Sequence, residues 1–315
     1  MTRCCAVLLV TAGQLAAADL TSEPAEVKVP VGTLKGTLVV PAGKGPFPVA
    51  LIHAGSGPTD RDCNQPLLLK TDAFKMLAEA LAAKGVATLR FDKRAVGVSA
   101  KVKEEDIRLE QYADDVIAWV ELLRKDKRFD RVAYIGHSEG ALIGLIAADR
   151  AKFDAFVSLC GPGEGIGLTL RAQLKRGLSK ELYEASEKVI AELEAGRTVK
   201  EYPKELASLF RPSVQPFLIS LLKPDPIKLV ADLKGPVLVV NGAADIQIPP
   251  EHGKKLAAAN PKAKLVIVEK MSHTLKPVDK PEDQKVAYTD PKRPLASGLV
   301  DALSEFLTNP PEKGR

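Results

Sequence analysis

Residues 132–140 read VAYIGHSEG, and this stretch decides the fold. Its first four residues form the apolar run of a short buried strand, and the chain from Ala141 onward has the apolar pattern of a helix. Between them lies a Gly-x-Ser-x-Gly sequence centred on Ser138. A tight turn from strand to helix tolerates only small neighbours and lifts the serine hydroxyl above the sheet. We therefore expect Ser138 to be a nucleophile; the plainer interpretation is a glycine-flanked helix start with a serine cap.

Outward from this stretch, short apolar strands alternate with amphipathic helices. Residues 26–31 and 33–40 predict an opening hairpin with Gly32 at its turn. Further strands are expected at 48–52, 86–91, 132–135, 155–160, 236–240 and 264–268, and helices at 72–84, 107–125, from 141, at 251–259 and at 295–307. Such alternation favours an α/β fold with a mostly parallel central sheet and helices on both faces.

One segment interrupts the alternation. Residues 161–235 contain no clear strand, but 168–176, 180–195 and 202–222 have helical patterns separated by Gly196 and by proline-containing turns. A structureless loop of that length is improbable in a compact domain. We therefore expect an inserted helical cap at 161–235, with the core built from 19–160 and 236–315.

The first eighteen residues have the pattern of a secretory signal peptide. Arg3 gives a positive start, residues 4–18 are uncharged and mostly apolar, and Ala16-Ala17-Ala18 is a small-residue cleavage pattern. The apolar stretch is shorter than the ~20 residues that a bilayer span needs. We expect cleavage before Asp19, a secreted or periplasmic protein and no stable membrane span.

Cleavage at that point would leave two cysteines, Cys63 and Cys160. Two cysteines are not a disulfide framework, and both a single bridge and two separate thiols stay open. Neither a C-x-x-C nor an H-E-x-x-H pattern occurs, so the sequence predicts no metal site, and no motif indicates a cofactor.

Composition narrows the classes of function. The 315 residues are 45% hydrophobic and 27% charged, which is typical of a globular protein rather than a disordered one. The net charge is +5, with acidic and basic residues interleaved, and only 5% of residues are aromatic. A nucleic-acid partner is disfavoured, because such proteins carry basic blocks interleaved with aromatic residues.

Three segments together resemble the α/β-hydrolase superfamily, in its serine esterase-type branch. Residues 53–62 (HAGSGPTDRD) are similar to the HGSGP-x-DRDGN segment of that group, 91–99 (FDKRAVGVS) to its FDKRGVGKS segment, and 136–140 (GHSEG) to its nucleophile motif. The resemblance covers nearly all of the chain after residue 18 and implies an α/β-hydrolase fold. Cys63 and Ala95 depart from it, since each stands where the group usually has glycine.

A serine hydroxyl needs a base that takes its proton and an acid that orients the base. The resemblance places the base at His273, directly after the last strand, and the acid at Asp245, within a loop at 241–249 (NGAADIQIP) similar to the family's G-x-x-D-x-x-V-P. The order Ser138, Asp245, His273 is that of α/β-hydrolases and differs from trypsin-like and subtilisin-like enzymes. The other histidines are His53, His137 and His252.

An oxyanion hole needs two N–H donors. The N–H of Glu139, directly after the nucleophile, is one, and by resemblance the N–H of Ser56 is the other, with Gly55 or Gly57 as alternatives. For the Glu139 side chain, a solvated position and a salt bridge to Arg94 both stay open.

Charged residues cluster in the loops that follow residues 53 and 91. We interpret this cluster as a salt-bridge network that braces the loops rather than as a binding site. Its members are Asp60, Arg61, Asp62, Asp92 and Arg94.

The sequence therefore predicts a secreted serine hydrolase that cleaves small-molecule carboxylic esters through an acyl-enzyme intermediate. Two alternatives stay open: a serine peptidase of the same fold, similar to aminopeptidases, and a catalytically silent binding protein on this scaffold. Fold alone cannot decide among them, so the prediction depends on the three side chains. The natural ester, its acyl-chain length and the oligomeric state are not readable from the residues.

Overall fold

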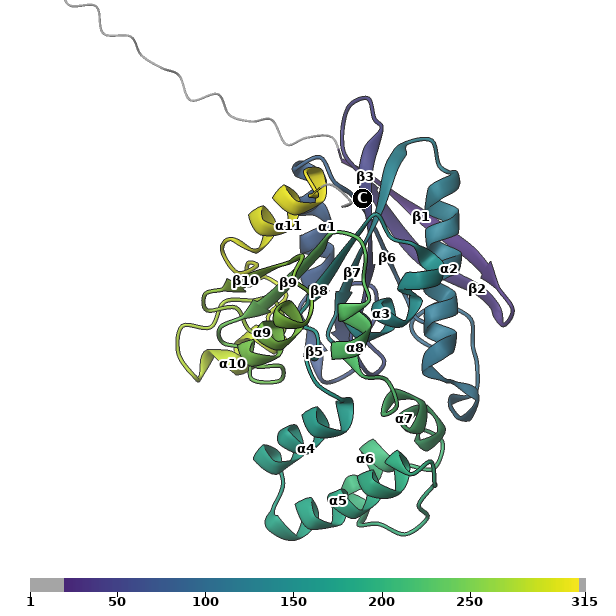
Figure 1. Cartoon of the computed structure of the whole chain (residues 1–315), viewed down its shortest axis with the longest axis vertical. Coiled ribbons are helices and arrows are strands. Elements are labelled where there is room, and N and C mark those ends of the chain that lie inside the picture. The colour runs from purple at the N-terminus through teal and green to yellow at the C-terminus, as the bar shows by residue number, and fades with distance from the viewer. Residues whose placement is uncertain (1–19, 312–315) are drawn as a thin grey trace, which may run out of the picture.

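A sheet of eight strands in the order β1-β2-β6-β3-β7-β8-β9-β10 forms the centre of the molecule (Figure 1). This computed structural model describes residues 20–311, so the expected signal peptide at 1–18 lies outside the described residues. The strands are β1 (Thr21–Val29), β2 (Gly32–Val40), β3 (Phe47–His53), β6 (Ala87–Phe91), β7 (Phe129–His137), β8 (Ala155–Leu159), β9 (Val237–Gly242) and β10 (Ala263–Val268).

Six of these strands, β6, β3, β7, β8, β9 and β10, run parallel to one another, whereas β2 pairs antiparallel with both β1 and β6. Every residue of β6, β8 and β9 is buried, in keeping with their mostly apolar sequences. The carboxyl ends of parallel strands meet at one edge of a sheet. The loops after β3, β6, β7, β9 and β10, which carry the predicted site residues, therefore leave the sheet at the same edge.

Helices cover both faces of the sheet. One apolar core joins it to α2 (Leu109–Lys125), α3 (Glu139–Ala151) and α9 (Pro250–Ala259), and the other joins it to α1 (Ala73–Ala83) and α11 (Leu299–Thr308). Side chains along β3 alternate between the two cores, with Val49 and Leu51 in the first and Ala50 and Ile52 in the second. The predicted fold class is confirmed.

Between β8 and β9 the chain is helical, with no strand. It forms α4 (Ile166–Gly177), α5 (Lys180–Glu194), a 3₁₀ turn η2 (Lys204–Leu206), α6 (Ala207–Phe210), α7 (Gln215–Leu221) and α8 (Pro226–Ala231). Helices α4 to α7 project beyond the end of the sheet, and we call them the cap (Figure 1). Helix α8 instead packs against α3 and α9 of the core. The single helix expected at 202–222 is divided because Pro203, Pro212 and Pro216 interrupt it.

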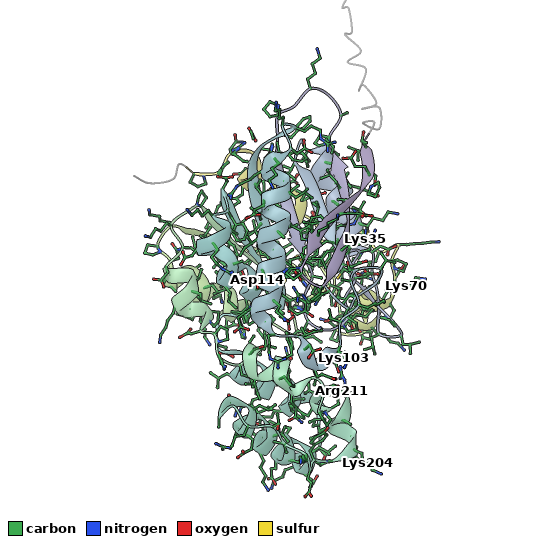
Figure 2. The ribbon with its side chains drawn as sticks, turned by 90° about the vertical axis from the view of Figure 1, so that its right-hand side faces the viewer. Lys35, Lys70, Lys103, Asp114, Lys204 and Arg211 are labelled. Atoms are coloured by element: carbon green, nitrogen blue, oxygen red, sulfur yellow. The ribbon has the colours of Figure 1, made fainter. Side chains whose placement is uncertain are left out.

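The cap joins the core near the start of α2. Arg211, at the end of α6, pairs with Glu104 in the 3₁₀ turn η1 (Glu104–Asp106), and Figure 2 shows Arg211 beside Lys103 at this junction. The Ser220 hydroxyl of α7 accepts a hydrogen bond from the Leu109 N–H at 2.9 Å. A further contact comes from α4, where the Gln173 side chain donates to the Gln247 carbonyl at 3.1 Å.

Several short elements escaped the sequence analysis. They are β4 (Asn64–Gln65) and β5 (Leu69–Lys70), which pair as a hairpin, and α10 (Asp283–Thr289). The opening hairpin is longer than expected, because β1 begins at Thr21, and Gly32 is the first residue of β2 rather than part of the turn. Within residues 20–311 no helix combines the length and apolar character needed to cross a bilayer.

Candidate active site

Ser138 lies on the turn between β7 and α3, with φ 54° and ψ −122°. Residues other than glycine rarely adopt a positive φ. A Cβ on Gly136 would lie 2.5 Å from the Gly140 carbonyl oxygen, and one on Gly140 would lie 2.6 Å from the His53 carbonyl oxygen. Positions 136 and 140 therefore require glycine, because there is no space for a side chain at either one. The turn has the strained, crowded geometry that the sequence predicts for a nucleophile.

The loop after β3 lies directly against this turn. A Cβ on Gly55 would lie 3.0 Å from the Ser138 Cβ. Among residues 20–311, no group accepts a hydrogen bond from the N–H of Ser56 or from the N–H of Glu139 at the start of α3. The start of a helix also favours negative charge. Two unengaged donors thus border the serine from two different loops.

The structure brings together the predicted acid and base. His273 Nδ1 lies 2.8 Å from Asp245 Oδ2, and both side chains are buried. The other carboxylate oxygen, Asp245 Oδ1, accepts the N–H of Gln247 at 2.8 Å and that of Ile248 at 2.9 Å. A carboxylate at Nδ1 fixes the ring proton there and leaves Nε2 as the basic nitrogen.

Asp245 is held in its ionised form despite its burial. Burial raises the pKa of its carboxyl group, but His273 and the N–H groups of Ile248 and Gln247 lower it by more, so its pKa lies below the ordinary value. The net effect favours a carboxylate that can stabilise a positive imidazole.

His137, the residue before Ser138, contacts His273, and among the described residues no hydrogen bond joins the Ser138 and His273 side chains. His137 Nε2 lies 2.8 Å from the His273 carbonyl oxygen, and the two ring centroids are 4.7 Å apart. The His137 contact therefore holds the backbone of His273 against the serine turn.

The other three histidines have different partners. His53 Nδ1 lies 2.7 Å from the Tyr134 hydroxyl, which itself donates to the Gly140 carbonyl. His137 is neutral, because burial and the neighbouring His273 lower its pKa to about 3. His252, on α9, accepts the Gly163 N–H at 3.0 Å. Among residues 20–311, His273 is therefore the one histidine hydrogen-bonded to a carboxylate, and His252 Nε2 lies 3.7 Å from the Glu164 carboxylate.

The charged residues of the two loops form close ion pairs within the protein. The pairs are Arg61–Asp92 at 2.8 Å, Arg90–Asp62 at 2.6 Å and Arg94–Asp115 at 2.6 Å. Asp60 accepts the backbone N–H groups of Asp62 and Asn64. These contacts favour a bracing role for the cluster over a binding role.

Both expectations for the Glu139 side chain are wrong. Glu139 is buried rather than solvated, and its carboxylate faces Lys93 at 3.9 Å while Arg94 pairs with Asp115. The sequence analysis missed Lys93. No local pattern marked it, because Lys93 stands between Asp92 and Arg94 in a charged stretch after β6.

Cys63 and Cys160 are both buried free thiols, so the bridge that the sequence left open does not form. One group of possible metal ligands occurs in the described part of the chain: His137, Cys160 and His273 have donor atoms within 4.8 Å of one another. His273 Nδ1 already contacts Asp245, and His137 Nε2 contacts a backbone carbonyl.

Known proteins share both sequence and fold with this chain. A family model described as serine aminopeptidase, S33, matches residues 70–213, which include Ser138 but neither Asp245 nor His273. The esterase EstD of Thermotoga maritima is 28% identical over 254 residues, which are 79% of this chain and 60% of that relative. The chain thus spans about 60% of the length of this curated relative.

Solved structures of other proteins have a fold similar to that of this chain. Est1E from Butyrivibrio proteoclasticus is similar with a TM-score of 0.55 at 17% identity, over 90% of this chain and 96% of the other. A hypothetical protein from Pseudomonas aeruginosa has a TM-score of 0.60 at 16% identity, over 96% and 98% of the two chains. Identities this low show a shared fold and no more. With the serine turn, the parallel sheet and these likenesses in hand, the chain has an α/β-hydrolase fold.

Proposed function

We propose that this protein is a serine hydrolase that cleaves carboxylic esters through an acyl-enzyme intermediate, with Ser138, His273 and Asp245 as its triad. The observation that carries the proposal is the 2.8 Å contact between His273 and Asp245, next to a serine on a strained turn. Similarity to an esterase supports the ester as substrate.

The reaction follows from these positions. The Ser138 oxygen attacks the ester carbonyl carbon while His273 Nε2 takes the hydroxyl proton. The carbon–oxygen bond to the alcohol then breaks, and the imidazolium returns its proton to the departing alkoxide. Water attacks the acyl-serine in the same way and releases the acid. Asp245 stabilises the imidazolium in both halves and keeps its own negative charge.

Negative charge develops on the carbonyl oxygen in both tetrahedral intermediates. The N–H groups of Ser56 and Glu139 are our proposed donors to that oxygen, because they border the serine and have no other acceptor among residues 20–311. Donors fixed in advance stabilise this charge without reorganising, and losing one such donor typically costs about 3 kcal/mol of barrier.

A fluorophosphonate probe and p-nitrophenyl esters of increasing chain length test the proposal. We expect the purified protein to be labelled and to hydrolyse short esters, and Ser138→Ala to lose both properties while remaining folded. Ser179→Ala, at the start of α5 in the cap, is the matched control and keeps both. A folded wild type that is neither labelled nor active would instead indicate a silent binding protein.

A peptidase is the second candidate function, because the matching family model is described as a serine aminopeptidase. Amides and esters use the same triad but differ in leaving group, so p-nitroanilides of amino acids separate the two activities. We expect esters to be cleaved and anilides to be left intact. Cleavage of the anilides at a comparable kcat/KM would favour the peptidase.

We also propose that residues 1–18 direct export, on the strength of their positive start, apolar stretch and small-residue end. Expression of the full chain in a bacterial host tests this. Amino-terminal sequencing of the exported protein is expected to begin at Asp19. Recovery of the chain from the cytoplasm with Met1 intact would contradict export.

A further inference from the structure

Lys93 is a fully enclosed lysine in the loop after β6, with 1% of its surface exposed. Its ammonium donates a hydrogen bond to the Gly55 carbonyl oxygen at 2.5 Å, lies 3.9 Å from the Glu139 carboxylate and sits over the Tyr112 ring at 5.6 Å from the ring centre. Burying a charge is costly unless it is paired and hydrogen-bonded, and here it has both kinds of partner.

The Gly55 carbonyl, the first partner of the Lys93 ammonium, belongs to the peptide unit that carries a proposed oxyanion donor. The Gly55 carbonyl and the Ser56 N–H are parts of one planar peptide, and in a trans peptide the two groups point in opposite directions. An ammonium that holds the carbonyl on one side therefore directs the N–H to the other side. It also draws electron density toward the carbonyl oxygen, which strengthens the N–H as a donor.

Other contacts in the loop hold a different peptide. The Ser56 carbonyl accepts hydrogen bonds from the Thr59 hydroxyl at 2.7 Å and from the Gln65 side chain at 3.1 Å. Among residues 20–311, Lys93 alone donates to the Gly55 carbonyl. Since Gly55 has no side chain to restrict its backbone, loss of Lys93 leaves this peptide free to rotate.

The second partner of the Lys93 ammonium is the carboxylate of Glu139, whose backbone N–H is the other proposed oxyanion donor. The carboxylate of Glu139 faces Lys93, and its own backbone N–H opens α3 beside Ser138. Burial lowers the pKa of Lys93, and the Glu139 carboxylate opposes that shift. One ammonium thus connects the loop after β3 with the start of α3.

We propose that Lys93 is a positioning residue of the oxyanion hole: its ammonium holds the Gly55–Ser56 peptide so that the Ser56 N–H faces the developing oxyanion, and Glu139 holds that ammonium in place. The proposal rests on the proposed function. Lys93 does not touch the substrate; it acts through the peptide that does.

The test compares an ester with its thionoester, in which sulfur replaces the carbonyl oxygen. Sulfur is a poor hydrogen-bond acceptor, so thionoester turnover already lacks much of the oxyanion stabilisation. We expect Lys93→Met to lower kcat for p-nitrophenyl acetate about 100-fold, the loss typical for one oxyanion donor, with little change in KM. For the thionoacetate we expect less than a tenfold loss, so the ratio of ester to thionoester turnover falls.

Asp115→Asn is the matched control, because it disrupts the neighbouring buried Arg94–Asp115 pair without touching the Gly55–Ser56 peptide. It is expected to lower stability and to leave the ratio at the wild-type value. If Lys93→Met does not fold, Lys93→Gln provides the same comparison, since its shorter amide cannot reach the carbonyl as a charged donor. A crystal structure of the folded variant is expected to show the Gly55–Ser56 peptide rotated.

The outcomes separate this inference from the proposed function. An active wild type whose Lys93 variants keep the wild-type ratio, with the peptide unmoved, overturns the role of Lys93 alone. Equal losses for ester and thionoester also overturn it, because they indicate a general structural defect. A wild type that turns over no ester overturns both the proposed function and this role.

Discussion

Ala95 and Cys63 have φ values of 62° and 69°, in the left-handed region that favours glycine. The group that this chain resembles usually has glycine at both positions, and glycine adopts such a conformation without steric cost. A left-handed conformation costs a non-glycine residue roughly 1–2 kcal/mol. This chain therefore carries strain at two positions in the loops that surround the site.

Ala95→Gly is expected to raise the free energy of unfolding. Relief of the left-handed strain outweighs the extra flexibility that glycine gives the unfolded chain, for a net gain of about 0.5–1 kcal/mol. Ala195→Gly, at the end of α5 with φ −79°, has no strain to relieve and is expected to lose about the same amount. Urea denaturation of both variants measures the difference, and losses of equal size would show that Ala95 is unstrained.

His137 makes stability depend on pH. Its pKa is about 3 in the folded protein against an ordinary value of 6.5, so below pH 6.5 the unfolded chain binds a proton that the folded chain does not. Its contribution is fully present above pH 6.5 and is lost as the pH falls toward 3, at up to about 1.4 kcal/mol per pH unit. His53, whose pKa is also lowered by burial and then by Lys93, adds a slope of the same sign.

His137→Gln is expected to reduce the slope of the free energy of unfolding against pH by up to about 1.4 kcal/mol per pH unit, which corresponds to one proton. The slope that comes from His53 remains. Urea denaturation at pH 7, 6 and 5 measures the free energy of unfolding of both proteins. Parallel lines for wild type and variant would mean that His137 titrates equally in the folded and unfolded chains.

Residue types and chain order predicted the Asp245–His273 contact, because each residue follows a strand that ends at the same edge of the sheet. The Lys93–Glu139 contact could not be predicted in that way. It depends on the relative placement of two loops from non-adjacent strands, which a local pattern does not encode. For the same reason the sequence left open a salt bridge from Glu139 to Arg94, the residue after Lys93.

At the scale of elements, α3 packs on β7 through a position without a side chain. A Cβ on Gly144 would lie 2.0 Å from a ring carbon of Tyr134. That ring is stacked near Phe153 and Phe156, and its hydroxyl is hydrogen-bonded to the Gly140 carbonyl, so it has no room to move aside.

Gly144→Ala is therefore expected to destabilise the protein by about 2 kcal/mol, although alanine favours a helix over glycine by about 1 kcal/mol. Gly177→Ala, at the last residue of α4 with no atom within 4 Å of the added Cβ, is the matched control and is expected to be neutral or stabilising. Chemical denaturation distinguishes them; a stabilised Gly144→Ala would mean that α3 can shift away from β7.

The sequence predicted helices well where the periodic apolar pattern extends over many residues. Helix α2, expected at 107–125, is found at Leu109–Lys125, and α1, expected at 72–84, is found at Ala73–Ala83. The hairpin of β4 and β5 has two residues in each strand, too few for an alternating pattern to appear. Helix α3 begins at Glu139 rather than Ala141 because it starts directly at the serine turn.

For the molecule as a whole, α7 is one of the elements that join the cap to the core. The Phe217 ring of α7 meets the Tyr112 ring of α2 edge-on, with centroids 5.7 Å apart. Phe217→Ala removes this contact and is expected to loosen the cap while the core sheet stays intact. Trypsin is expected to cut the variant within residues 161–235 faster than it cuts the wild type.

Leu168→Ala is the control for that experiment, because Leu168 also lies in the cap but is 59% exposed. Its digestion pattern is expected to match the wild type. Faster cutting in both variants, or in neither, would mean that the Phe217–Tyr112 contact does not hold the cap. The alternation of strand and helix predicted the layered core, but the placement of the cap depends on contacts between residues far apart in the chain, which a local pattern does not encode.

The free thiols of Cys63 and Cys160 can report local unfolding, because both are buried in the folded protein. Burial raises the pKa of Cys63 to about 12, and burial together with Asp245 raises that of Cys160 as well, so neither reacts with a disulfide reagent while its surroundings stay closed. Cys63 precedes β4 and Cys160 follows β8. The time courses of their modification in rising urea would therefore record, without any introduced dye, whether the two regions open together or one after the other.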